Sequence, residues 1–176
     1  MVWFLQILFL LGAAAIIWVA QSSIDFRALL KNSDRLQLMG ACVLGVVFLW
    51  TLKTGIQPGL NVHFLGLTAM TLMLGWRLST LVAPVALLVL TVLGIYPLHE
   101  FGVNLFLGML VPISVTYFIF LVTYSYLSRH LFVYIFIAVF FNAAFTITMQ
   151  MFSFAVYYKL IDAFQWYVII DDYFSI

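Results

Sequence analysis

The lengths of the apolar runs constrain this chain more than any other feature of its sequence. A helix needs roughly 20 apolar residues to cross about 30 Å of hydrocarbon, and runs of about that length recur along the chain. Of the 176 residues, 66% are hydrophobic and only 7% are charged, whereas a soluble domain carries roughly 25% charged residues. The sequence therefore predicts a multi-pass protein of the inner or cell membrane.

We expect an all-α polytopic bundle of about six transmembrane helices that forms one domain over residues 1–176. The run from Val62 to Leu93 would overshoot the bilayer as one helix at about 1.5 Å per residue, so we divide it at Gly75-Trp76-Arg77. The first run lacks the pattern of a cleaved secretory signal, and we expect it to be retained as a helix. The predicted helices cover residues 2–20, 37–54, 62–75, 78–94, 104–127 and 131–158. We expect a charged connection from Asp25 to Arg35 before the second helix, and a polar connection from Gly94 to Val103 that leads into the fifth.

The positions of the Lys and Arg residues predict how the bundle is oriented. Positively charged loops stay cytoplasmic, and with six helices one side of the membrane carries five basic residues while the other carries only Lys53 and Lys159. Both termini are therefore predicted to be extracytoplasmic. The net charge is +1, so we expect the lipid bilayer rather than nucleic acid as the surrounding partner. The five basic residues are Arg27, Lys31, Arg35, Arg77 and Arg129.

A few polar residues near the predicted outer face are candidates for a metal site. His63 and His99 carry imidazoles, which are common ligands of nickel, cobalt, copper and zinc. Two ligands are too few, so donors such as Asn61, Glu100 and Asn104 would have to complete the site. Each has an ordinary alternative: His63 can be a buried histidine bonded to a carbonyl, His99 can be solvated, and Asn104 can cap a helix.

Other polar residues lie inside the predicted helices. Asn142, Thr146 and Gln150 are spaced at four and share one helix face, where they either form interhelical hydrogen bonds or line a cavity. Pro84 and Pro112 also lie inside helices, and neighbouring groups must then satisfy the carbonyls that they free. Small residues predict close helix contacts; they are Gly40, Ala41, Gly45, Gly66, Ala69 and Gly108.

The sequence carries none of the motifs of soluble enzymes that we sought. It has no nucleophile elbow, no phosphate-binding loop and no pair of carboxylates in a helical frame. The single cysteine, Cys42, excludes an intrachain disulfide and a cysteine-rich metal site. We therefore expect a protein that is not an enzyme, and any ATP hydrolysis linked to it must come from another polypeptide.

Two short segments carry a resemblance to a known family. Residues 61–68 read Asn-Val-His-Phe-Leu-Gly-Leu-Thr, and residues 102–109 read Gly-Val-Asn-Leu-Phe-Leu-Gly-Met. These segments resemble the substrate-capture components of cobalt/nickel-type energy-coupling factor (ECF) transporters, of the CbiM and NikM kind. In that family a His-Leu-Leu-Gly-like segment opens a helix and a Gly-x-Asn segment begins another about forty residues later. Here His63 and Asn104 are forty-one residues apart, and the resemblance covers about residues 55–145.

The resemblance implies a membrane-embedded capture protein that binds a divalent transition metal from the outside. Such a protein works with a transmembrane coupling subunit and cytoplasmic ATPases, and its cargo is nickel, cobalt or copper. The resemblance assigns His63 as the internal ligand and Asn104 as a supporting residue. Metal-binding members begin Met-His, whereas this chain begins Met1-Val2-Trp3, so specificity for nickel or cobalt does not carry over.

Two functions from other classes remain open. One is a haem-binding membrane anchor of a redox complex, with His63 and His99 as axial ligands. The other is a structural or assembly subunit that has no ligand and buries its aromatic residues against a neighbouring membrane protein.

Overall fold

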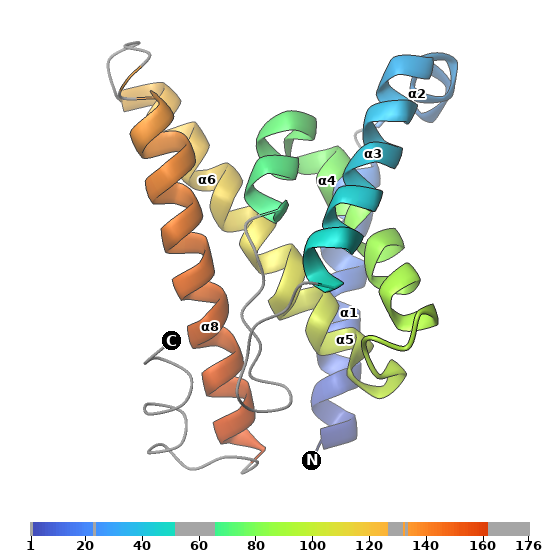
Figure 1. Ribbon diagram of the computed structural model, residues 1–176. Coiled ribbons are helices and arrows are strands. Elements are labelled where there is room, and N and C mark those ends of the chain that lie inside the picture. Colours follow the sequence, from blue (N-terminus) through green and yellow to red (C-terminus); the bar gives the residue numbers. More distant parts are fainter. Residues whose placement is uncertain (1, 23, 52–65, 127–131, 133, 162–176) are drawn as a thin grey trace.

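The structure is a bundle of antiparallel helices. The computed structural model describes residues 2–22, 24–51, 66–126, 132 and 134–161, and no β-strand occurs within these ranges. Figure 1 shows that α1 begins and α8 ends at the same lower end of the bundle. The elements in chain order are α1 (Val2–Ser22), α2 (Phe26–Lys31), α3 (Ser33–Thr51), α4 (Gly66–Val92), η1 (Leu98–Glu100), α5 (Phe101–Val103), the π-helix η2 (Asn104–Leu110), α6 (Val111–Tyr126), the π-helix η3 (Tyr134–Phe141) and α8 (Asn142–Leu160).

The long helices have the properties of membrane spans. In the described part of the chain, five helical stretches are long and apolar enough to cross a membrane by length and composition. Their outward faces carry large apolar side chains such as Trp3, Leu44 and Phe118, which are mostly exposed. Such surfaces are favourable only in contact with lipid or another apolar partner. The prediction of an all-α polytopic transmembrane bundle is confirmed.

The long helix α4 is a hairpin of two shorter helices. Gly75 has φ 77° and ψ 166°, a backbone conformation that favours glycine because it has no Cβ. The Ser79 hydroxyl donates a hydrogen bond of 3.2 Å to the Met70 carbonyl, although nine residues of straight helix would separate them by about 13 Å along the axis. The chain therefore turns back at Gly75, and the predicted division of this run is confirmed. With the hairpin counted as two helices, and apart from the short α2, the described part of the bundle has six helices.

Two predictions about the connections are wrong. Residues 26–31, which we expected to belong to a charged connection, form α2 because Asp25 caps it: its Oδ1 accepts hydrogen bonds from the backbone N–H groups of Arg27 and Ala28, at 3.0 and 3.2 Å. The helix predicted over 104–127 begins earlier, at Leu98, directly after the extended residue Pro97. The segment expected to be a polar loop is therefore the first part of that helix.

Glycine permits the close contact between this early helical segment and α1. A Cβ added at Gly102 would lie 2.8 Å from the backbone oxygen of Gln6, so only glycine fits without a backbone shift. Gly66 and Gly108 also lie close to neighbouring side chains, as predicted. Gly40 and Gly45 do not, because a Cβ at either position would meet nothing within 4 Å among the described residues, and the prediction that these two make close contacts is wrong.

We expect Gly102→Ala to destabilise the protein by about 1–3 kcal/mol, because the added methyl group must push α1 away from the segment that begins at Leu98. The measurement is unfolding in mixed detergent micelles. Gly40→Ala is the matched control: it adds the same methyl group in open space and should be neutral or stabilising by up to about 1 kcal/mol. Equal effects of the two substitutions would contradict the close contact at Gly102.

Candidate functional site

The structure describes two of the four residues predicted for the site. His99 and Asn104 lie on the helical segment that begins at Leu98, whereas Asn61 and His63 lie outside the described residues. The His99 side chain is 63% exposed, and its Nε2 lies 3.9 Å from Glu100 Oε1. Asn104 is only 5% exposed. The two described residues therefore lie in different surroundings, with His99 on the surface and Asn104 in the core.

Asn104 has a buried side-chain amide whose nitrogen lacks a partner. Its backbone is helical, with φ −62° and ψ −37°, so it does not cap a helix start, and that alternative is wrong. Its Nδ2 is buried and finds no hydrogen bond among the residues that the structure describes. A buried amide left in this way costs about 1–3 kcal/mol. A native protein retains such a group most readily where something else binds it.

A second buried amide lies on α1, next to the same helical segment. Gln6 is 8% exposed, and its Nε2 donates a hydrogen bond of 3.0 Å to the Tyr157 hydroxyl. Its Oε1 accepts a hydrogen bond of 3.3 Å from the backbone N–H of Val103. Gln6 thus joins α1, α5 and α8 at Val103, the residue that precedes Asn104. We did not single out Gln6 from the sequence, although it is the only amide in the apolar run from residue 2 to 20.

The connection before this helix adds a buried phenol. Tyr96 is 7% exposed, and its ring lies 5.9 Å from that of Trp50 on α3. Burial raises the pKa of Tyr96 well above its ordinary value, and the Glu100 carboxylate raises the pKa further. The phenol of Tyr96 therefore stays protonated at neutral pH.

The described side chains cannot form a metal site by themselves. Within the described ranges, no group of three or more His, Cys, Asp or Glu residues could hold a metal ion. The buried polar side chains in the described ranges are amides, hydroxyls and phenols, which bind transition metals less readily than imidazole or thiolate. A metal held here would therefore need at least one imidazole or amine from another part of the chain.

The polar stripe on α8 forms interhelical hydrogen bonds rather than lining a cavity. The Asn142 amide donates to the Thr116 carbonyl on α6 at 3.0 Å, and the hydroxyls of Thr116 and Thr146 are 3.1 Å apart. Gln150 Nε2 donates to the Gly108 carbonyl on η2 at 3.1 Å. Thr116, Asn142, Thr146 and Gln150 are all buried. The interpretation of the stripe as a set of interhelical hydrogen bonds is therefore confirmed.

The bond from Gln150 has a specific reason in the sequence. In an α-helix the Gly108 carbonyl would accept a hydrogen bond from residue 112, but Pro112 has no amide proton. Gln150 supplies the missing donor from α8, as expected for a proline inside a transmembrane helix. A π-helical stretch, η2, ends at Leu110, two residues before this proline.

We expect Gln150→Leu to destabilise the protein by about 1–2 kcal/mol, because the Gly108 carbonyl then loses a donor that Pro112 cannot replace. The measurement is a double-mutant cycle on unfolding in micelles. In a Pro112→Ala background, the alanine N–H can satisfy the carbonyl, and Gln150→Leu should cost clearly less. If it costs the same in both backgrounds, the proline is not the reason for the bond.

Comparison with known proteins identifies the family. Residues 3–170 match CbiM, described as the cobalt uptake substrate-specific transmembrane region. Searches of curated proteins and of solved structures find no match. The family match spans nearly the whole chain and includes both the α1 amide and the segment around Asn104. The chain belongs to the CbiM family of transmembrane components for cobalt uptake.

Proposed function

We propose that this protein is the substrate-capture component of an ECF transporter, and that its cargo is a divalent transition metal. Cobalt is the first candidate because of the family, and nickel and copper follow from the same ligand chemistry. The observation that supports the proposal most strongly is the buried Asn104 amide, whose nitrogen has no partner among the described residues. An amide can offer either an oxygen ligand or an N–H donor to a bound species.

The proposed site is built around that amide. His63 supplies the imidazole that the described donor set lacks, and Asn61 and Asn104 line the cavity. The Gln6 bridge to Tyr157 and Val103 holds α1, α5 and α8 together beside it. The exposed His99 and the half-buried Glu100 beside it form an entrance site with fewer ligands and weaker binding.

The direction of loading follows from the distribution of charge. The upper end in Figure 1 carries α2 with Arg27 and Lys31, together with Arg35 and Arg77, whereas Lys159 is near the lower end of α8. The positive-inside rule then makes the upper end cytoplasmic, so both termini and the Asn104 site are extracytoplasmic. Release to the cytoplasm requires a transmembrane coupling subunit and cytoplasmic ATPases.

The proposed function is tested with protein purified gently from the membrane. Calorimetric titration with Co²⁺, Ni²⁺ and Cu²⁺ should show saturable one-to-one binding of at least one of them, and Mg²⁺ should not bind. Coupling and ATPase subunits should co-purify. An absence of binding for all three metals would contradict the proposed cargo, and a Soret band in the absorption spectrum would favour the haem anchor.

A further inference from the structure

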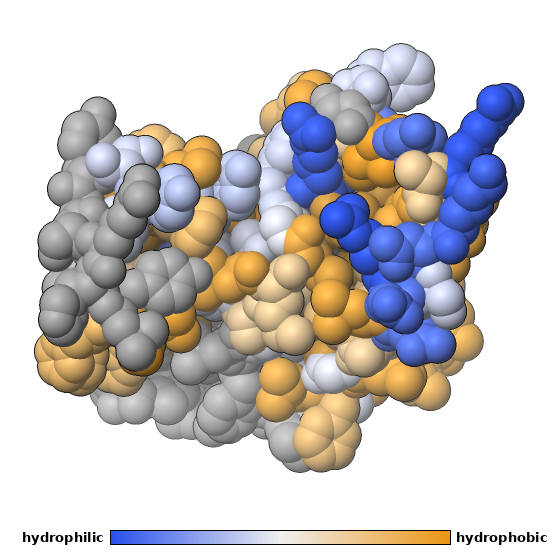
Figure 2. Space-filling model, turned by 90° about the horizontal axis from the view of Figure 1, so that it is seen from above, coloured by the Kyte–Doolittle hydropathy of each residue, from blue (hydrophilic) through white to orange (hydrophobic). Residues whose placement is uncertain are grey.

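A separate cavity lies at the upper end of the bundle. It has a volume of about 770 Å³ and lies between α2, the first turn of α3, the Gly75 turn of α4 and Tyr117 of α6. Sites for small ligands are commonly about 300–1,000 Å³. Figure 2, which views this end from above, shows hydrophilic residues gathered on one side, over α2 and the start of α3, and apolar surface elsewhere.

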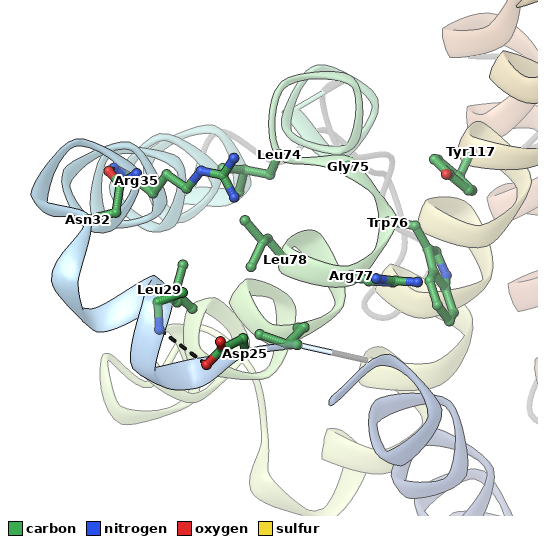
Figure 3. Close-up of a pocket in the computed structure, with 12 residues that line it drawn as sticks. Asp25, Leu29, Asn32, Arg35, Leu74, Gly75, Trp76, Arg77, Leu78 and Tyr117 are labelled. Atoms are coloured by element: carbon green, nitrogen blue, oxygen red, sulfur yellow. Dashed lines mark hydrogen bonds between the residues drawn. The ribbon is translucent and has the colours of Figure 1, made fainter. Parts of the chain in front are cut away.

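Two arginines give the cavity its charge. Figure 3 shows Arg35 extending from α3 toward Leu74, and Arg77 extending from the hairpin turn toward Trp76. A guanidinium has five N–H donors, so one contact with a neighbour leaves others for a ligand. Among the described residues that line the cavity, only Asp25 is acidic. Its Oδ1 already accepts two backbone N–H bonds that cap α2.

The rest of the lining is apolar and aromatic. Leu29, Leu74 and Leu78 contribute aliphatic walls, and the rings of Trp76 and Tyr117 are stacked with their centroids 6.5 Å apart. Tryptophan and tyrosine are enriched where a membrane protein meets the boundary between hydrocarbon and water. The cavity therefore combines cationic donors with apolar walls at the level of the lipid head groups.

We infer that this cavity binds the phosphate group of an anionic phospholipid. The guanidinium groups of Arg35 and Arg77 would donate charge-assisted hydrogen bonds to the phosphate oxygens, and the leucines would contact the glycerol and the first methylenes of the acyl chains. Basic pockets between helices on the cytoplasmic side of membrane proteins suit such head groups. A free phosphate ion shares the charged part of this chemistry but makes no use of the apolar walls.

The test measures binding of phosphatidylglycerol to the purified protein. Native mass spectrometry in a detergent that preserves lipid complexes detects the bound lipid. Phosphatidylcholine and inorganic phosphate are tested in parallel. The wild-type protein should prefer phosphatidylglycerol, and Arg35→Gln and Arg77→Gln should each weaken the affinity for this lipid by about fivefold, the effect of one basic residue at a charged membrane surface. Arg27→Gln is the matched control, because Arg27 is at the same end but does not line the cavity.

The proposal holds if the two cavity variants lose the preference while Arg27→Gln keeps it, and if inorganic phosphate does not displace the lipid. Displacement of the lipid by millimolar phosphate would identify a site for free phosphate and overturn the lipid assignment. Equal weakening by all three substitutions would mean general attraction to the charged end, which also overturns it. If the cavity variants keep the lipid but lose a co-purifying subunit, the arginines bind a protein partner and the proposal is wrong.

Discussion

Replacing Asn104 with leucine should make the protein more stable and at the same time weaken its affinity for divalent metal. Leucine is similar in size and has no polar atoms to bury, and the Asn104 nitrogen has no hydrogen bond among the described residues. Relief of a buried, unpaired donor should raise the free energy of unfolding by about 1 kcal/mol. Loss of a supporting group beside a metal should lower the affinity by about ten- to hundredfold. Unfolding in micelles and calorimetry with Co²⁺ measure the two effects.

Asn142→Leu is the matched control for this experiment. Asn142 is also buried, but its amide donates to the carbonyls of both Thr116 and Ala138. Its replacement should therefore destabilise the protein by about 1–2 kcal/mol and leave the affinity for metal unchanged. If Asn104→Leu also destabilises the protein and leaves the affinity unchanged, Asn104 is an ordinary core residue and the proposed site is wrong.

The transmembrane helices could be predicted because the thickness of the bilayer fixes their length. α1 spans Val2–Ser22, against a prediction of 2–20, and α3 ends at Thr51. The hairpin at Gly75 was also predictable, because a single helix of that length does not fit the membrane. The thickness of the bilayer determines these features, so they can be predicted without knowing which helices pack against each other.

The features that sequence analysis missed depend on contacts between distant residues. We took Gly102 for part of a loop, but it lies inside a helix because α1 packs so closely there that a Cβ would meet the Gln6 carbonyl. The hydrogen bond from Gln6 to Tyr157 joins residues 151 positions apart. A lone amide in an apolar run shows that a partner is needed, because an unpaired one is costly, but it does not identify the partner.

The same limit applies to the candidate site. From the sequence we expected Asn104 to open a helix and His99 to lie in the loop before it, yet the helix begins at Leu98 and contains both residues. His99 faces outward beside Glu100, while Asn104 is in the core. The helix starts six residues earlier than predicted, and His99 and Asn104 therefore lie in different surroundings.

Replacing His63 with alanine should abolish tight binding of divalent cobalt, nickel or copper, whereas His99→Ala should change the affinity by less than about threefold. The buried polar side chains among the described residues include amides and phenols but no imidazole, so the proposed site depends on His63 for its strongest neutral ligand. Removal of a ligand should cost more than the roughly ten- to hundredfold typical of a supporting residue. Calorimetric titration with each metal measures the loss.

His99 differs because water already surrounds it. Its side chain is 63% exposed and has one carboxylate nearby, with 3.9 Å between His99 Nε2 and Glu100 Oε1. An exposed pair of this kind contributes little net free energy, but it can raise the local concentration of a cation and so speed its association. His99→Ala should therefore slow metal association at low ionic strength more than it weakens the affinity, as stopped-flow measurements would show. If His99→Ala abolishes equilibrium binding as completely as His63→Ala, both imidazoles are ligands of one site, and the separation of an inner site from an entrance is wrong.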